Sequence, residues 1–172
     1  ELTALPVSGA GLYEGPSSVA SAGYLAIGAT GRKRFVVSRG LHPHSRETLA
    51  TYSVGYGAEV VEVGLEGGLT DAAALAAAVD AETAAVFLQS PNFLGAVEDV
   101  EALSGAARDP KPRPEAEGPS QDAGPDAPRS TSPVVVGQYD ALTLGILAPP
   151  GESGVDVAVG EGQQLGNRLD FG

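Results

Sequence analysis

The 172-residue chain contains no cysteine, no methionine and no tryptophan, and only 5% of its residues are aromatic. Without cysteine it can form neither a disulfide framework nor a thiolate metal site, and it offers no thiol nucleophile. No apolar stretch approaches the roughly 20 residues that span a bilayer, and the first residues lack the basic and apolar regions of a signal peptide. These absences predict an intracellular protein with no membrane contact and a core built from alanine, valine and leucine.

Basic residues are scarce and unevenly placed. Ten lysine and arginine residues face 22 aspartate and glutamate residues, which gives a formal net charge of −12 at pH 7. None of the basic residues lies between Arg46 and Arg108. Because nucleic-acid binding requires basic side chains that displace phosphate counterions, this balance predicts no nucleic-acid partner. We interpret the acidic middle of the chain as a solvated surface, with a docking face for a basic partner as the alternative.

Lysine is especially rare, since the chain contains only Lys33 and Lys111. A lysine that forms a Schiff base needs a buried, desolvated setting that lowers its pKa. Lys33 lies in a basic run just before a predicted strand, and Lys111 lies in a proline-rich segment, so neither offers that setting. We therefore expect no covalent bond between this chain and an aldehyde cofactor.

Short apolar stretches rich in β-branched residues alternate with helix-length segments. The near-continuous apolarity of the short stretches is typical of strands covered on both faces, and the alternation predicts β-α-β units in a mostly parallel α/β sheet. The predicted strands are residues 35–38, 59–63, 84–88, 133–136 and 155–159, and the predicted helices are residues 17–29, 45–54, 70–79 and 98–107.

Residues 109–132 interrupt this alternation with six prolines and charges of both signs. Such a segment cannot bury enough apolar surface to offset the entropy of ordering it, so we predict that it is disordered. Connections in α/β units usually take about 2–6 residues, which makes this segment an insertion or a sequence error. An interdomain linker is the alternative, but the strands on both sides look like parts of one sheet.

Two glycine-rich stretches, residues 9–15 and 160–166, are candidate phosphate sites. Their glycines are spaced by two and then four residues, so both miss the dinucleotide pattern G-x-G-x-x-G, and neither contains the lysine of a P-loop. Residues 9–15 precede a predicted helix, so free backbone N–H groups there could bind an anion, and a plain turn is the alternative. A free-standing nucleotide-binding domain is disfavoured on this evidence.

The remaining candidates for chemistry have simpler interpretations. His42 and His44 flank Pro43, and a His-x-His pair can bind zinc, but no third ligand stands at metal spacing. We favour a role for this segment at the start of the following helix. The adjacent carboxylates Glu98 and Asp99 would point to different faces of a helix, so we interpret them as an N-terminal turn and not as an acid/base pair.

Several short runs share their order and spacing with one known family. Residues 89–95 read Gln-Ser-Pro-Asn-Phe-Leu-Gly and residues 159–163 read Val-Gly-Glu-Gly-Gln, and both runs are specific. The other matching runs are Glu1-Leu-Thr-Ala-Leu-Pro-Val, Leu12-Tyr-Glu-Gly15, Val37-Ser-Arg-Gly-Leu-His-Pro43, Val60-Val-Glu-Val63, Leu69-Thr-Asp71, Val97-Glu-Asp-Val100, Pro149-Pro-Gly-Glu152 and Leu165-Gly-Asn167. Outside the proline-rich segment, the chain resembles the P-protein of the glycine cleavage system, in the form of subunit 1 of the two-subunit bacterial glycine dehydrogenase (decarboxylating).

The resemblance implies the three-layer, mostly parallel large domain of fold type I pyridoxal-phosphate enzymes, which agrees with the alternation described above. In that family the reaction decarboxylates glycine and passes the aminomethyl group to the lipoyl arm of the H-protein. The lysine that binds pyridoxal phosphate belongs to subunit 2. The resemblance therefore implies a heterotetramer with subunit 2 in the bacterial cytoplasm, with no cofactor bound covalently to this chain.

The same resemblance gives candidate residues for a site shared between the subunits. Gln163 stands near the position where subunit 2 carries its lysine, and Asp140 stands where fold type I enzymes place an aspartate that pairs with the pyridine nitrogen. We interpret Asp140 as a structural relic, because no cofactor is expected on this subunit. No catalytic residue and no metal ligand is expected, and the candidates at the shared site are Tyr13, Asp140, Gln163 and Asn167.

The resemblance also predicts that residues 1–172 are part of a large domain that is incomplete at both ends. Glu1 would correspond to the middle of the family's subunit 1, and a small domain would follow Gly172, which agrees with a first residue other than methionine. The leading hypothesis is a subunit that helps to wall the shared site. The alternative is a non-catalytic, diverged or truncated remnant, motivated by residues 109–132 and by Gly9 and Gly11, which replace polar residues of the family.

Overall fold

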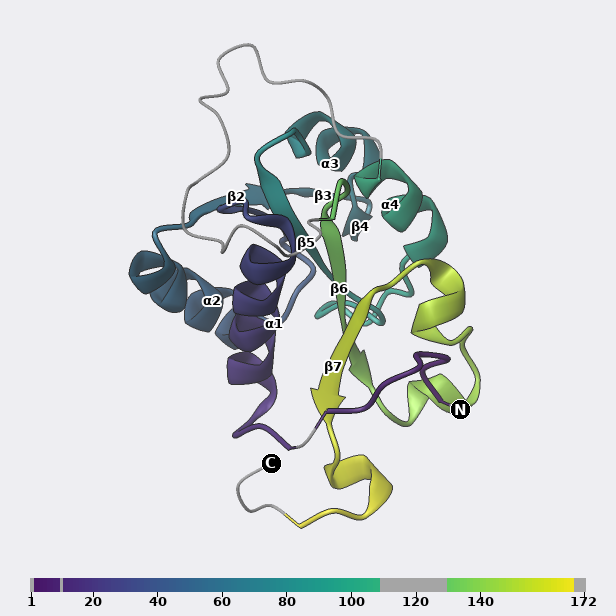
Figure 1. Cartoon of the computed structure of the whole chain (residues 1–172). Helices are drawn as coiled ribbons and strands as arrows, with labels where there is room; N and C mark the ends of the chain where they lie inside the picture. Colours follow the sequence, from purple (N-terminus) through teal and green to yellow (C-terminus); the bar gives the residue numbers. More distant parts are fainter. Residues whose placement is uncertain (1, 10, 109–129, 169–172) are drawn as a thin grey trace.

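The computed structural model describes residues 2–9, 11–108 and 130–168 (Figure 1). Five parallel strands form the main sheet in the order β2-β1-β5-β6-β7, and β1 is the strand at which the order reverses. The strands are β1 (Arg34–Ser38), β2 (Glu59–Val63), β5 (Thr83–Gln89), β6 (Val134–Asp140) and β7 (Val157–Glu161), and the helices are α1 (Gly15–Thr30), α2 (Pro43–Tyr56), α3 (Ala72–Ala78) and α4 (Val100–Ala107).

Different helices cover the two faces of this sheet. On the face beneath α1 and α2, the rings of Phe35 and Phe87 meet edge to face with centroids 5.4 Å apart. On the opposite face, α3 and α4 pack over Val36, Val86 and Val135, which stand in register on three neighbouring strands. Because both faces are buried, these strands are apolar nearly throughout, and the predicted three-layer, mostly parallel α/β arrangement is confirmed.

The helices begin where the sequence supplies a side-chain acceptor for their first turn. The N-terminal caps of α1 to α4 are Glu14, His42, Asp71 and Asp99. In α1, Glu14 accepts a hydrogen bond from the Ser17 N–H while Ser17 Oγ accepts one from the Glu14 N–H, which is a capping box. The expected role of the His42 segment in starting a helix is confirmed, because His42 Nδ1 accepts from the His44 N–H at 3.2 Å.

The structure differs from the sequence-based prediction in detail. Strand β7 begins two residues later than predicted. Helix α3 begins at Ala72 because Asp71 caps it, and it ends at Ala78, before Val79, which has an extended backbone. A short hairpin of β3 (Leu65–Glu66) and β4 (Leu69–Thr70) was not predicted, although its turn uses two glycines with positive φ. Most of the predicted disordered insertion, residues 109–129, lies outside the described residues. No helix within the described ranges is long and apolar enough to cross a membrane.

Candidate functional site at the carboxyl edge of the sheet

The parallel strands of the main sheet all end at one edge, towards which the arrowheads of β6 and β7 point in Figure 1. Helices α1 and α2 begin at this same edge. In open parallel sheets, ligands bind beyond the carboxyl ends of the strands, close to the strand where the order reverses. We therefore expect the functional site among the residues that end these strands and start these helices.

The end of β7 contacts the start of α1. Glu161 stands opposite Asp140 in the β6–β7 register, and its Oε1 accepts a hydrogen bond from the Gly15 N–H at 3.1 Å. A Cβ atom on Gly15 would lie 2.9 Å from that oxygen, and a Cβ on Gly160 would lie 2.4 Å from the carbonyl oxygen of Tyr139. Gly15 therefore permits the close approach of β7 to α1, and Gly160 permits the close approach of β7 to β6.

Two neighbouring cavities open at this edge. The larger, of about 1420 Å³, lies between residues 5–9, 11–12 and 14–15, the start of α1, strand β7 and the segment after it. The smaller, of about 330 Å³, is polar. Its lining residues are Glu14, Pro16, His42, His44, Ser45, Gln138 and Glu161. Neither Ser45 Oγ nor Gln138 Oε1 has a hydrogen-bond partner among the described residues.

Three contacts fix the position of His42 at the start of α2. The His42 N–H donates to Gln89 Oε1 at 2.8 Å, which joins the start of α2 to the end of β5. The His42 ring packs edge to face against His44 and against Phe93, with centroids 5.1 and 5.0 Å apart. Among the described residues, no three His, Asp or Glu side chains are grouped so that they could hold a metal ion.

A buried carboxylate organises the loop that follows β5. Glu98 is only 6% exposed, and its oxygens accept hydrogen bonds from the Thr70 N–H (3.0 and 3.1 Å), Thr70 Oγ1 (2.9 Å) and Asn92 Nδ2 (2.8 Å). The interpretation of Glu98 and Asp99 as one N-terminal turn is therefore right for Asp99, which caps α4, and wrong for Glu98. The loop that Glu98 holds presents the half-exposed side chains of Phe93 and Leu94.

The structure brings only some of the predicted site residues together. Gln163 and Asn167 line the larger cavity. Tyr13 is largely exposed, and the residues on either side of it, Leu12 and Glu14, line that cavity. Asp140 lines neither of the two cavities. It is exposed at the end of β6, where its Oδ1 accepts from the Leu142 N–H at 2.9 Å.

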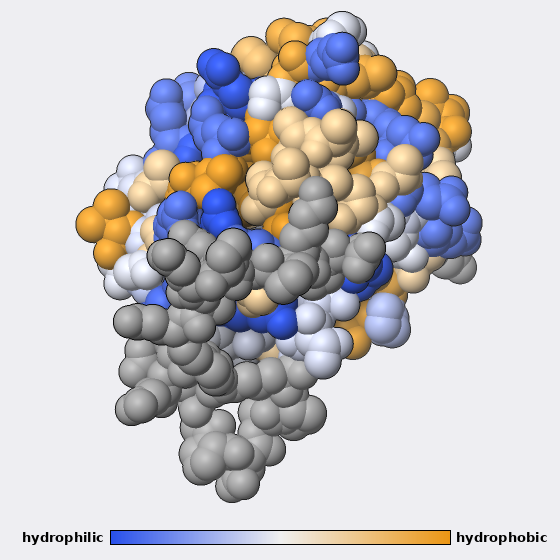
Figure 2. Space-filling model, turned by 90° about the horizontal axis from the view of Figure 1, so that it is seen from above, coloured by the Kyte–Doolittle hydropathy of each residue, from blue (hydrophilic) through white to orange (hydrophobic). Residues whose placement is uncertain are grey.

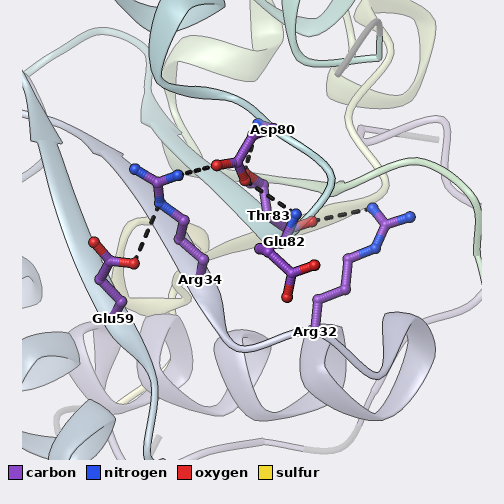
Figure 3. Close-up of polar contacts among 6 residues, drawn as sticks. All are labelled: Arg32, Arg34, Glu59, Asp80, Glu82 and Thr83. Carbon is purple, nitrogen blue, oxygen red and sulfur yellow. Dashed lines mark hydrogen bonds and ion pairs between the residues drawn. The ribbon is translucent and has the colours of Figure 1, made fainter. Parts of the chain in front are cut away.

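The opposite, amino edge of the sheet is closed by ion pairs (Figure 3). Arg34 at the start of β1 pairs with Asp80, and its Nε lies 3.5 Å from Glu59 Oε2. Asp80 Oδ1 also accepts from the Thr83 hydroxyl at 3.1 Å. Lys33 immediately precedes β1, so it lies at this edge. Figure 2, which views the molecule from this side, shows hydrophilic residues around hydrophobic ones.

The described residues at the carboxyl edge do not fit pyridoxal phosphate on this chain. No lysine lies among the described residues of this edge, and Gln163 follows the end of β7. Both carboxylates at the start of α1, Glu14 and Glu161, already accept hydrogen bonds from its first turn, where a phosphate would need those donors. The hydrogen-bond donors at the start of α1 are therefore occupied by acidic side chains of the chain itself.

A buried tyrosine lies close to this edge on β6. Tyr139 is 8% exposed and packs into the core beneath α3 and α4, and burial raises its pKa from 10.0 to about 12. A raised pKa means that the neutral phenol is the form compatible with the folded protein. Tyr139 therefore acts as a core side chain and not as a proton donor at neutral pH.

The sequence patterns did not indicate Glu161 and Gln138 as site residues, and they indicated Glu98 only as one of two adjacent carboxylates. Glu161 lies on β7, Gln138 on β6 and Glu98 in the loop after β5, so the folded sheet alone brings them to one edge. Glu161 and Gly15 are 146 positions apart, so no local pattern indicates their contact. The signal that could have found Glu161 is its position in the run Val-Gly-Glu-Gly-Gln, because the flanking glycines mark a close approach of backbones.

Comparison with known proteins places the chain in a family. The profile of the glycine cleavage system P-protein matches residues 1–113 and 119–172. A probable glycine dehydrogenase (decarboxylating) subunit 1 of Brevibacillus brevis is 38% identical over the whole chain, which spans 34% of that relative's length. A crystal structure of a glycine decarboxylase (P-protein) of the glycine cleavage system in inhibitor-bound form shares 36% identity and a TM-score of 0.76, over 99% of this chain and 33% of that one.

A more distant structure bears on the fold alone. A cysteine desulfurase of Escherichia coli is 16% identical, with a TM-score of 0.65 over 92% of this chain and 36% of its own. The predicted fold class, the large-domain architecture of fold type I enzymes, is confirmed by the observed sheet and by these structural neighbours. With a profile match along nearly its whole length, the chain belongs to the P-protein family of the glycine cleavage system.

Proposed function

We propose that this chain is part of subunit 1 of a bacterial, cytoplasmic glycine dehydrogenase (decarboxylating). In this proposal subunit 2 holds pyridoxal phosphate through its own lysine. The two subunits together decarboxylate glycine and pass the aminomethyl group to the lipoyl H-protein. The observation that carries the proposal is the combination of a family match with a carboxyl edge whose described residues include no lysine.

The contribution of this chain is to complete and wall the shared site. Its carboxyl edge supports that role because the edge is rigidly built. Glu98 holds the loop that presents Phe93 and Leu94, and Gln89 fixes the start of α2 through the His42 N–H. Exposed apolar side chains on such a loop suit contact with a second subunit.

The four candidate residues have unequal parts in this proposal. Gln163 and Asn167 share a cavity with the loop that contains Tyr13, so these three would face the shared site. Asp140 would serve the fold alone, because its carboxylate accepts from a backbone N–H in its own turn. None of the four is assigned a catalytic step.

Reconstitution tests the proposal. The full-length protein that carries this segment would be expressed with and without subunit 2, and complex formation and glycine-dependent exchange of CO2 would be measured. We expect a stable complex whose exchange activity needs both subunits, and we expect Lys33→Ala to leave that activity unchanged, because Lys33 lies at the opposite edge of the sheet.

Two results would count against the proposal. Exchange activity by this protein without subunit 2 would show that it holds the cofactor itself. A failure of the two subunits to associate would remove the shared site. A complex without exchange activity would instead favour the alternative, a diverged remnant of subunit 1.

A further inference from the structure

We infer that Glu161 is a built-in anion, which occupies the phosphate-binding position at the start of α1 and closes it to external ligands. This inference does not depend on the proposed function, because it concerns only contacts within the chain. Helix N-termini at the carboxyl edge of a parallel sheet are anion sites by default, since their first N–H groups lack partners inside the helix. In this chain those N–H groups already donate to acceptors of the chain itself.

Every N–H group of the first turn of α1 is accounted for. The Gly15 N–H donates to Glu161 Oε1 at 3.1 Å, and Pro16 has no N–H. The Ser17 N–H donates to Glu14 Oε1 at 3.0 Å, and the Ser18 N–H donates to the Glu14 carbonyl oxygen at 3.0 Å. An incoming phosphate would therefore find no free donor unless it displaced a carboxylate.

The position of Glu161 is fixed from both sides. Pairing of β7 with β6 places Glu161 opposite Asp140, and the missing side chain of Gly160 lets the β7 backbone pass the carbonyl oxygen of Tyr139. On the helix, the missing side chain of Gly15 leaves room for the carboxylate. Two glycines on two elements thus allow a contact that bridges the end of the strand and the start of the helix.

The charge in the smaller cavity also opposes an external anion, whereas the larger cavity, which Glu14, Gly15 and Glu161 line as well, includes Arg168. Glu14 and Glu161 place two carboxylates at the positive end of the α1 dipole, so that end is already neutralised. The smaller cavity beside it is lined by these two acids, two histidines and neutral residues, with no lysine or arginine among its described lining. A phosphate entering this cavity would meet like charges and no permanent cation.

The glycine-rich stretch before α1 leads into a helix N-terminus that could bind an anion, and the chain itself supplies that anion. The expected ligand of this position is a carboxylate from β7, and the consequence is a clamp between α1 and the strand that is adjacent to Gln163 and the larger cavity.

Phosphate binding to the full-length protein tests this inference without subunit 2. Inorganic phosphate would be titrated into the wild type, Glu161→Ala and Glu66→Ala, with chloride as the competing salt, and binding would be followed by calorimetry and by thermal unfolding. Glu66 lies on the exposed hairpin strand β3, so Glu66→Ala matches the change in net charge at a distant position. We expect Glu161→Ala to bind phosphate at least about tenfold more tightly than the other two proteins, because it frees a helix N–H and removes a like charge.

Each outcome decides the matter. Wild-type affinity for phosphate equal to that of Glu161→Ala would overturn the inference, and so would a Glu161→Ala protein that folds and gains no affinity. If Glu161→Ala unfolds in chloride buffer, added phosphate should restore its cooperative thermal transition, since a ligand that binds only the folded state stabilises it. A variant that phosphate cannot restore would show that Glu161 is not acting as an anion at this helix.

Discussion

The two edges of the sheet use charge in different ways. At the amino edge, Arg34 pairs with Asp80 and Glu59, so cations and anions that belong to neighbouring strands neutralise one another. At the carboxyl edge, Glu98 and Glu161 accept hydrogen bonds from backbone N–H groups and neutral side chains, while Glu62 near the end of β2 pairs with Arg39 and Arg46.

The difference indicates what each edge does. The ion pairs of Arg34 at the amino edge join the start of β1 to the start of β2 and to the turn before β5. Carboxylates at the carboxyl edge take the donors that a ligand would otherwise use, at the start of α1 and in the loop after β5. A fold whose carboxyl edge commonly binds ligands thus has, in this chain, its donors at the start of α1 and in the loop after β5 satisfied by its own side chains.

The largest expected effect comes from removing the ion pair between Arg34 and Asp80 at the amino edge. Asp80→Ala would leave the partly buried Arg34 guanidinium without its main partner and would remove the acceptor of Thr83 Oγ1. We expect a loss of about 3 kcal/mol in the free energy of unfolding, measured by urea denaturation. Glu59→Ala is the matched control, because its carboxylate is about half exposed and should cost less than about 1 kcal/mol. Equal losses in the two variants would contradict this account of the edge.

A second substitution probes the loop of the carboxyl edge. Glu98→Ala would remove the acceptor shared by Thr70 and Asn92, and leaving buried donors unsatisfied should cost about 2 kcal/mol. Hydrogen exchange should quicken at the Ala96 N–H, which bonds to Asn92 Oδ1. Asp99→Ala, which removes only the cap of α4, should leave exchange in this loop unchanged. Equally fast exchange in both variants would mean that Glu98 does not specifically stabilise this loop.

A smaller loss of stability is expected from opening the clamp at α1. Glu161→Ala removes one acceptor and one favourable charge at a helix N-terminus, which should lower the free energy of unfolding by about 0.5–1 kcal/mol. Glu66→Ala should change it by less than about 0.5 kcal/mol, because exposed substitutions away from specific contacts have small effects. A loss above about 3 kcal/mol for Glu161→Ala would show that the contact is mainly structural.

A further effect is confined to alkaline pH. Because burial raises the folded-state pKa of Tyr139 from 10.0 to about 12, the folded protein keeps a proton that the unfolded chain releases in this range. The contribution of neutral Tyr139 to the free energy of unfolding is therefore fully present below pH 10, and it falls as the pH rises towards about 12. Tyr139→Phe should reduce this fall and leave stability near pH 7 little changed, as chemical denaturation at several pH values would show. An unchanged pH profile in Tyr139→Phe would contradict the assignment to this tyrosine.

Local sequence patterns were enough to predict much of the fold. The strands β1, β2 and β5 lie within a residue or two of their predicted positions, because continuous β-branched runs bounded by turns indicate buried parallel strands. The start of α2 was predicted at Ser45, after the His-Pro-His run, and the helix begins two residues earlier, at Pro43. These features depend on interactions between near neighbours in the chain.

The candidate site was less predictable because its contacts join distant segments. Glu161 reaches Gly15 only after β7 pairs with β6, and Glu98 becomes buried only when the β3–β4 hairpin covers it. A prediction from adjacent carboxylates could not separate Glu98 from Asp99, since their difference lies in tertiary burial. The resemblance to a family supplied Gln163 and Asn167, which no local pattern distinguishes.

Cofactor labelling tests the central claim most directly. Pyridoxal phosphate would be added to the complex of the full-length protein with subunit 2, fixed with borohydride to the lysine that holds it, and located by mass spectrometry of peptides. The account predicts that the label lies on a lysine of subunit 2, with neither Lys33 nor Lys111 of this chain modified. A stoichiometric label on Lys33 or Lys111 would contradict it.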